Sequence, residues 1–152
     1  MLEELKIRIH DYKNIEEKLK RLGAKFTEEM SVVDTYFKQS AGEVLKITED
    51  DKGNFLVNLK LKEGKFQILK YEKIDDVEKL KKELTDKFGV KCVLKKKRRF
   101  FDFEDFMINI NLIEGVGEFL IVEGEKVSSE IIERLGFKNP EYITVSFDEL
   151  KK

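Results

Sequence analysis

Apolar and polar residues alternate at the start of the chain. Between residues 2 and 9, the apolar side chains of Leu5, Ile7 and Ile9 occupy every second position. This period of two predicts a β-strand with one apolar face. Comparable runs, separated by turn-forming residues, predict further strands. These lie over residues 32–39, 43–49, 54–61, 66–74, 91–103, 106–112, 117–124 and 142–147.

Helical spacing of apolar residues occurs three times. It predicts one helix that Asn14 caps, and two more over residues 75–88 and 128–135. Each predicted helix is followed by a glycine, Gly23, Gly89 or Gly136, which suits the left-handed closing position. No linker rich in Pro, Ser or Gly divides the chain, so residues 1–152 are predicted to form one domain. The expected fold is α+β, dominated by an antiparallel sheet or barrel.

The polar faces of these strands are strongly charged. Charges share a face in the groups Glu4, Lys6 and Arg8; Lys60 and Lys62; Lys70 and Glu72; and Lys96 and Arg98 or, in the other register, Lys95, Lys97 and Arg99. One interpretation is a solvated outer surface. The other is a barrel with a charged lumen, in which clustered cations need a polyanion such as a chain of phosphates. Glu123, on the same strand face as Phe119 and Ile121, poses the same choice between a solvated edge and a charged interior.

Composition narrows the possible partners. Charged residues make up 40% of the chain, yet the net charge is only −1, which argues against nucleic-acid binding. Lys/Glu enrichment of this kind is typical of many hyperthermophile proteins. Cys92 is the only cysteine, so an intrachain disulfide and a cysteine-based zinc cluster are excluded. The sequence shows no apolar run of membrane-spanning length, and we expect a soluble cytoplasmic protein, monomeric or homodimeric.

Eight segments, in order, resemble the motifs of the CYTH family, the class IV adenylate cyclase and thiamine triphosphatase group, also called triphosphate tunnel metalloenzymes. The segments are LEELKIRI, VVDTYF, VLKIT, LVNLKLK, LKYEKI, KKKRRFF, INLIEGVGEFLIVE and ITVSFDEL. The resemblance implies an eight-stranded antiparallel barrel, or tunnel, flanked by helices. It also implies that basic side chains in the lumen hold a triphosphate, while acids from several strands hold Mg²⁺ or Mn²⁺.

The resemblance carries over to specific positions. The triphosphate-binding residues that it implies are Lys6, Lys46, Lys60, Lys70, Lys96 and Arg98, and the metal-binding residues are Glu4, Glu72 and Glu123. The choice of Lys96 and Arg98 fixes the register of their strand, and the opposite register would bring Lys95, Lys97 and Arg99 inward. Tyr36, beside Asp34, is interpreted as a core aromatic residue rather than part of the tunnel mouth.

Several positions depart from the family pattern. Leu2, Asn111 and Ile121 stand where acids are expected, Lys46 and Lys70 stand where Arg is expected, and Thr48 replaces a second Arg. Lysine is a flexible point charge without the planar fork of Arg. Three carboxylates from three strands could still hold one Mg²⁺ against a triphosphate, but a second metal is not expected.

Three functions follow as hypotheses. The first is binding and hydrolysis of a nucleoside, thiamine or inorganic triphosphate with a divalent metal, or cyclisation of ATP as in class IV adenylate cyclases. The second is a catalytically impaired module that binds a nucleotide or polyphosphate. The third is an interaction role with a solvated charged face. The first two predict that Glu4, Lys6, Lys60, Glu72, Lys96, Arg98 and Glu123 converge on one cavity.

Overall fold

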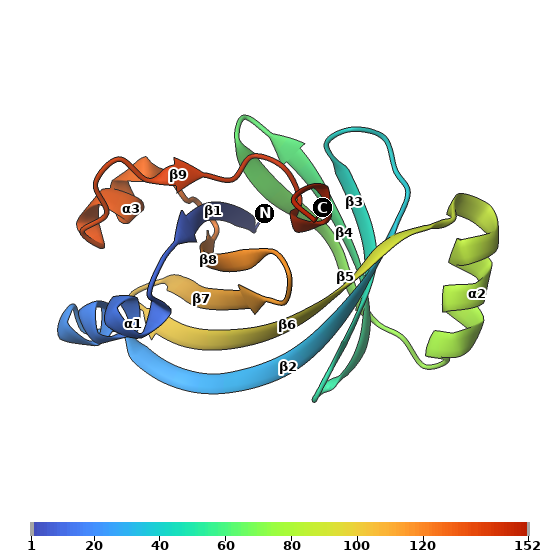
Figure 1. Cartoon of the computed structure of the whole chain (residues 1–152), viewed down its shortest axis with the longest axis horizontal. Helices are drawn as coiled ribbons and strands as arrows, with labels where there is room; N and C mark the ends of the chain where they lie inside the picture. Colours follow the sequence, from blue (N-terminus) through green and yellow to red (C-terminus); the bar gives the residue numbers. More distant parts are fainter. Residues whose placement is uncertain (1, 152) are drawn as a thin grey trace.

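The protein folds into a closed antiparallel barrel with a helix-covered side (Figure 1). The computed structural model describes residues 2–151. The strands are β1 (Glu3–Ile9), β2 (Lys25–Phe37), β3 (Glu43–Asp50), β4 (Gly53–Lys62), β5 (Lys65–Lys73), β6 (Val90–Phe103), β7 (Phe106–Ile113), β8 (Gly117–Gly124) and β9 (Glu141–Tyr142). The helices are α1 (Tyr12–Arg21), α2 (Val77–Phe88), α3 (Ser129–Arg134) and the 3₁₀ helix η1 (Phe147–Glu149).

The barrel closes because β1 uses its second edge for two partners. The strand order is β5-β4-β3-β2-β6-β7-β8-β1-β9, and β1 also pairs with β5. At its start, Glu3 pairs with Gln67 of β5, whereas at its end Ile7 pairs with Tyr142 of β9. The prediction of an eight-stranded antiparallel barrel with flanking helices is therefore confirmed, with β9 as an added ninth strand.

The predicted closing strand over residues 142–147 is wrong for most of its length. The Ile143 N–H donates to the Lys6 carbonyl at 2.8 Å, after which the segment leaves β1. Since β5 already pairs with the first residues of β1, the segment beyond Ile143 finds no free edge to join. It ends instead in η1, which lies at one opening of the barrel (Figure 1).

The helix boundaries differ slightly from the expected ones. Asn14 does not cap α1, which begins at Tyr12, because Asp11 is the N-cap and its carbonyl accepts from the Asn14 N–H. The three glycines have the expected positive φ, 100° at Gly23, 83° at Gly89 and 88° at Gly136, but the ψ of 145° at Gly89 lies outside the left-handed helical region. None of the helices in the described part of the chain is long and apolar enough to span a membrane.

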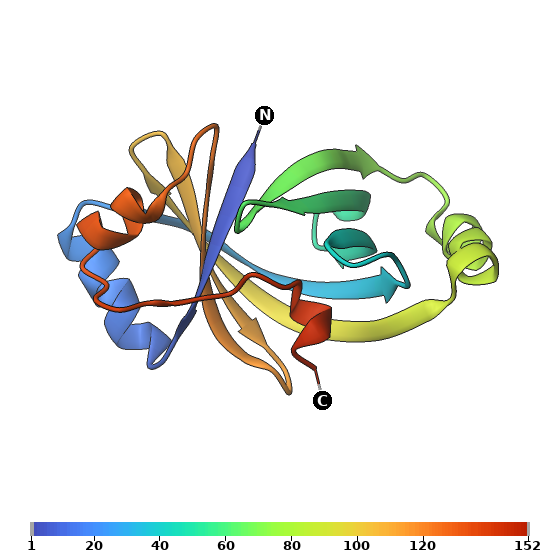
Figure 2. The same ribbon diagram turned by 90° about the horizontal axis from the view of Figure 1, so that it is seen from above.

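The core lies partly outside the barrel. α1 and α3 cover the outer face of the strands around β1, and α2 lies at the opposite end of the molecule (Figure 2). On β1 the buried residues Leu5, Ile7 and Ile9 belong to this outer core. Burial of each such side chain contributes about 1.5–3 kcal/mol. Because alternate side chains of a strand point to opposite faces, Glu4 and Lys6, which alternate with these apolar residues, point into the barrel.

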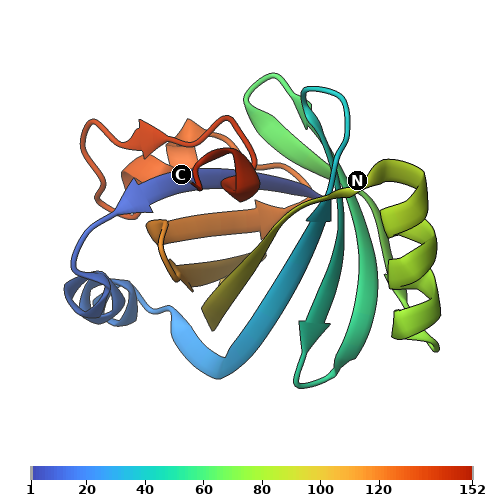
Figure 3. The same cartoon turned by 45° about the vertical axis from the view of Figure 1, so that its right-hand side comes forward.

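The two longest strands join the two ends of the molecule. β2 and β6 run side by side from the α1 end towards the α2 end, curving around the interior (Figure 3). Their inward residues include Val32 and its cross-strand partner Lys96, and Met30 and its partner Arg98. The register question is thereby answered: Lys96 and Arg98 face inward, whereas Lys95 and Lys97 are exposed. Arg99 also lies outside the cavity, where it pairs with Glu16 and Glu29.

Candidate functional site

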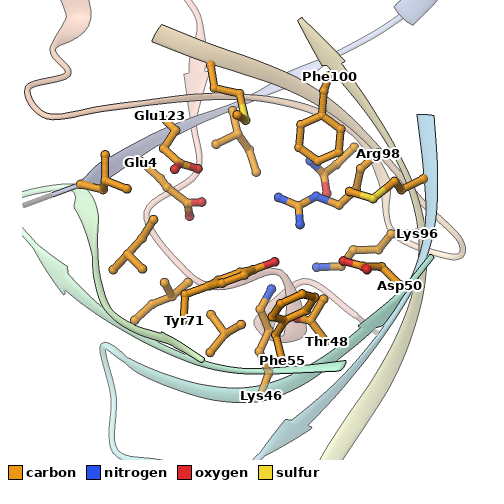
Figure 4. A pocket seen from close by; sticks show the side chains of 18 of the residues that line it. Glu4, Lys46, Thr48, Asp50, Phe55, Tyr71, Lys96, Arg98, Phe100 and Glu123 are labelled. Carbon is orange, nitrogen blue, oxygen red and sulfur yellow. The ribbon is translucent and has the colours of Figure 1, made fainter. Parts of the chain in front are cut away.

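A cavity of about 440 Å³ lies inside the barrel, and we call it the lumen. Six of the nine residues proposed from the sequence line it: Glu4, Lys6, Lys46, Lys96, Arg98 and Glu123. They come from β1, β3, β6 and β8, of which only β1 and β8 are neighbours in the sheet. Figure 4 shows several of these side chains converging on the space between the strands.

The other three proposed residues do not reach the lumen. Lys60, Lys70 and Glu72 are all exposed. On β4, the residues before Lys60 that point inward are Val57 and Leu59, so the alternation of the strand directs Lys60 outward. The expectation that these three side chains share the cavity is therefore wrong.

A β-bulge explains the outward positions on β5. Leu59 pairs with Ile68 and Asn58 pairs with Lys70, which leaves Leu69 as an extra residue in the ladder. One extra residue exchanges the two faces of the strand beyond it. Consequently Tyr71 lines the lumen together with Ile68, and Lys70 turns to the outside.

Asp34 on β2 organises the cationic side of the site. Its side chain is fully buried. One carboxylate oxygen lies 2.9 Å from Lys46 Nζ and 2.6 Å from Lys96 Nζ, and the other accepts a 2.6 Å hydrogen bond from Thr48. Burial opposes ionisation of Asp34, but the two ammonium groups outweigh it and hold its pKa well below the usual range. In the sequence, Asp34 lies in a family motif, but no ligand-binding or structural role is predicted for it there.

Lys96 is the most confined cation of this group. It is 5% exposed, and besides Asp34 it donates to the Tyr36 hydroxyl at 2.8 Å. Burial lowers the pKa of Lys96 to about 7, although Asp34 acts in the opposite direction. Tyr36 is a buried core residue, as interpreted from the sequence, and its hydroxyl also serves the polar network.

Lys6 is enclosed by aromatic rings. Its ammonium lies 4.1 Å from the ring centroid of Phe66 and 4.3 Å from that of Phe147, the first residue of η1. Cation–π contacts of this kind partly replace the water that a buried ammonium loses. Burial lowers the pKa of Lys6 to about 8, while Glu4, 3.9 Å away, acts to raise it.

Glu4 and Glu123 form a carboxylate pair on one side of the lumen. They are direct cross-strand partners on β1 and β8, and both line the cavity. Burial, and next the charge of Glu4, raise the pKa of Glu123 to about 7. Two like charges opposite each other destabilise a sheet unless a cation or a proton lies between them.

Arg98 faces this pair, and its charge acts to lower the pKa of Glu123, but it forms no salt bridge within residues 2–151. Its Nε is buried and has no hydrogen-bond partner among the described residues. Its cross-strand partner is Asn111, which donates instead to Asn109. Asn109 is fully buried, and its own amide nitrogen also has no partner within the described part of the chain.

The places of the missing acids are apolar or neutral. Ile121 is 2% exposed and lies between Lys6 and Asn109 in the sheet, and Leu2 lines the lumen near Glu4. Across residues 2–151, no group of three Asp, Glu, His or Cys side chains is arranged to hold a metal ion. Of the acids proposed as metal ligands, Glu4 and Glu123 line the lumen, which Glu28 and Asp50 also line.

These features define a closed β-barrel whose lumen presents cations on one side and a carboxylate pair on another. No family model matches the chain. It is 36% identical over 143 residues, 86% of its length, to a Methanocaldococcus jannaschii protein named "putative adenylate cyclase", of which it covers 79%. The chain therefore belongs to the CYTH family, the class IV adenylate cyclase and thiamine triphosphatase group.

Solved structures share the fold. A Pyrococcus horikoshii protein superposes with a TM-score of 0.86 at 24% identity, and the match covers 100% of both chains. A Hippeastrum protein, described as a "putative adenylyl cyclase" with a dominant triphosphatase activity, superposes with a TM-score of 0.67 at 16% identity. That match covers 100% of this chain and 97% of the other. At these identities the similarity concerns the fold.

Proposed function

We propose that the protein binds a triphosphate-containing compound in the lumen together with one Mg²⁺ or Mn²⁺, and that it hydrolyses this compound. The coarse function rests on family membership, since the archaeal relative is named for adenylate cyclase activity and the Hippeastrum structure for triphosphatase activity. The observation that carries the proposal is Arg98, a half-buried guanidinium aimed at the cavity with an orphaned Nε. Arg binds phosphate through paired, charge-assisted hydrogen bonds.

The remaining cations can serve the phosphates to different degrees. Besides the aromatic rings around it, Lys6 has one ion pair among the described residues, the weak contact to Glu4 at 3.9 Å, so its ammonium can accept a stronger anionic partner. Lys46 and Lys96 already share Asp34, so phosphate oxygens would add to an existing ion-pair network. We assign Arg98 and Lys6 the main phosphate contacts, with Lys46 and Lys96 in support.

Glu4 and Glu123 are the residues that fit a divalent cation. Mg²⁺ is commonly bound by one or two carboxylates, waters and substrate phosphates rather than by a full cage of protein ligands. The cross-strand pair supplies two such carboxylates, and a cation bound beside them would relieve their mutual repulsion. When bound, the metal would neutralise phosphate charge and orient the phosphate chain.

Catalytic impairment is the alternative. Ile121 and Leu2 leave no ligands for a second metal beside the pair, and a second metal is one means of activating a water molecule. The protein would then bind a nucleotide or polyphosphate without turnover. Cyclisation of ATP is a further variant of the enzymatic hypothesis, in which the ribose 3′-hydroxyl attacks the α-phosphorus and pyrophosphate leaves, whereas in hydrolysis water attacks the terminal phosphorus and phosphate is released.

A triphosphate panel tests the proposal. ATP, thiamine triphosphate and tripolyphosphate are each added with Mg²⁺ or Mn²⁺, and both the melting temperature and the released phosphate are measured. A ligand at about 100 times its Kd stabilises the folded state by about 2.7 kcal/mol, which a thermal shift detects. Metal-dependent phosphate release supports the hydrolase, a shift without release supports the binding module, and cyclic AMP with pyrophosphate identifies a cyclase.

Matched variants locate the site. Lys96→Met and Lys97→Met change the same residue type on the same strand, but Lys96 faces the lumen and Lys97 is exposed. Only Lys96→Met should reduce the ligand-induced shift. Equal loss in both variants, or no shift with any triphosphate, would refute the proposed site.

A further inference from the structure

The two sides of the lumen differ in chemistry. The side formed by β4 and β5 presents Phe55, Val57, Leu59, Ile68 and Tyr71, none of which is charged. We call these five residues the apolar wall. The cations, in contrast, come from β1, β3, β6 and, at Lys52, the turn between β3 and β4. A linear polyphosphate has charged oxygens on every side, whereas this cavity offers charge on only part of its surface.

The bulge at Leu69 brings Tyr71 into this wall. Without the extra residue, Lys70 and Glu72 would follow Ile68 on its inward face, since they lie two and four positions further along β5. With the bulge, Tyr71 takes the inward position and both charges leave the lumen. A bulge that exchanges a charged pair for an aromatic ring changes what the lumen can bind.

Tyr71 and Phe55 form an aromatic platform on the wall. Their ring centroids are 4.9 Å apart at an interplanar angle of 31°, and Tyr71 is 51% exposed. Figure 4 shows the Tyr71 ring reaching into the cavity from the side opposite Arg98 and Lys96. A half-exposed aromatic ring beside a polar cavity gains contact area when a second flat group stacks on it.

We propose that the apolar wall binds a flat ring system attached to the phosphates, so that the ligand is a ring-bearing organic phosphate rather than a bare inorganic polyphosphate. The inference rests on the proposed function, because the phosphates anchor at Arg98 and Lys6. Phosphate oxygens placed against the wall would lose hydration without gaining hydrogen bonds. A base or another aromatic heterocycle has an apolar face that suits the same surface.

Three probes with the same phosphate chain separate the ring from the phosphates. They are tripolyphosphate, methyl triphosphate, which adds an ester without a ring, and ATP, and their Kd values are measured by calorimetry with Mg²⁺. Stacking on an aromatic side chain strengthens binding by about tenfold or more. We therefore expect ATP to bind at least about tenfold more tightly than either of the other probes.

Tyr71→Ala should remove most of this preference and leave tripolyphosphate affinity within about twofold of the unmodified protein. Because Tyr71 is half-exposed, the variant should fold. The matched control is Phe26→Ala, since Phe26 is 42% exposed and packs on Phe101 in the core outside the barrel.

The outcomes are distinct. ATP preference that is lost in Tyr71→Ala and kept in Phe26→Ala supports the inference. Equal affinity for the three probes, or equal weakening of all three in Tyr71→Ala, overturns the inference and leaves the proposed function standing. Failure of all three probes to bind overturns both.

Discussion

Replacement of Asp34 by Asn tests the polar network most directly. The substitution keeps the shape of the side chain and removes the charge that two buried ammonium groups share, at 2.9 Å for Lys46 and 2.6 Å for Lys96. Removal of one partner from a buried ion pair costs about 3–5 kcal/mol, because the other charge is left buried and uncompensated. Lys96, with a pKa of about 7, can release its proton, so we expect the free energy of unfolding to fall by about 3 kcal/mol, the lower end of this range.

Urea unfolding at neutral pH, in a buffer free of multivalent anions, measures this loss. Thr48→Val is the control, because it removes the 2.6 Å hydrogen bond to Asp34 but keeps both ion pairs. Loss of one hydrogen bond to a buried charged group lowers the free energy of unfolding by about 1.5–3 kcal/mol. Asp34→Asn should therefore be the more damaging of the two variants.

An added anion distinguishes the charge effect from a packing defect. In Asp34→Asn, tripolyphosphate can supply the negative charge that Lys46 and Lys96 have lost, so it should raise the unfolding free energy more in the variant than in the unmodified protein. A decrease of less than about 1 kcal/mol in the free energy of unfolding of Asp34→Asn would refute the proposed charge effect, and so would equal stabilisation of both proteins by the anion.

Four further changes have defined outcomes. The folded-state pKa of Lys96, about 7, lies below the ordinary 10.5. Between these values the unfolded chain binds more protons than the folded one, so the urea concentration at the unfolding midpoint should increase as the pH is raised from about 7 to about 10. Lys96→Met should flatten that rise. Arg98→Met should weaken triphosphate binding about tenfold in calorimetry, while the ligand-free melting temperature stays unchanged because Arg98 forms no salt bridge among the described residues. Glu123→Gln should abolish the Mg²⁺ dependence of that affinity, and persistence of the dependence would place the metal elsewhere. Deletion of Leu69 should raise tripolyphosphate affinity relative to ATP, and an unchanged ratio would show that the bulge does not set selectivity.

The fold could be predicted because its signals are local. Alternation over residues 2–9 places the apolar face of β1, and glycines after each helix mark their ends. These signals depend on neighbours within a few residues. The order of the motifs then supplied the closure of the barrel, which alternation alone does not determine.

The site was only partly predictable because it depends on non-local geometry. Strand alternation placed Lys6 correctly, and the spacing of the family motif selected Lys96 and Arg98 over the opposite register, since no irregularity interrupts these ladders near the lumen. It failed at Lys70 and Glu72, because the bulge at Leu69 has no residue signature and is visible only in the pairing with β4. A Gly at the bulge would have been a signal, but Leu gives none.

The role of Asp34 alters the meaning of the charged lumen. A cluster of buried lysines was expected to require a polyanion, because unpaired cations in a low-dielectric interior repel one another. In the structure, the single negative charge of Asp34 pairs with both Lys46 and Lys96, and Glu4 lies near Lys6. These acids reduce the repulsion among the lysines without a ligand, so the lysines alone are weak evidence for one.

A ligand is indicated instead by the groups that the protein leaves unsatisfied. These are the guanidinium of Arg98, with its orphaned Nε, and the carboxylate pair of Glu4 and Glu123 on neighbouring strands. A phosphate chain with one divalent cation would satisfy both at once, since its oxygens would accept from Arg98 and the cation would offset the charge of the carboxylates. An anion without a metal would satisfy Arg98 but add repulsion at the pair. The proposed metal and phosphate sites therefore depend on each other, and loss of either group should weaken the response to the other ligand.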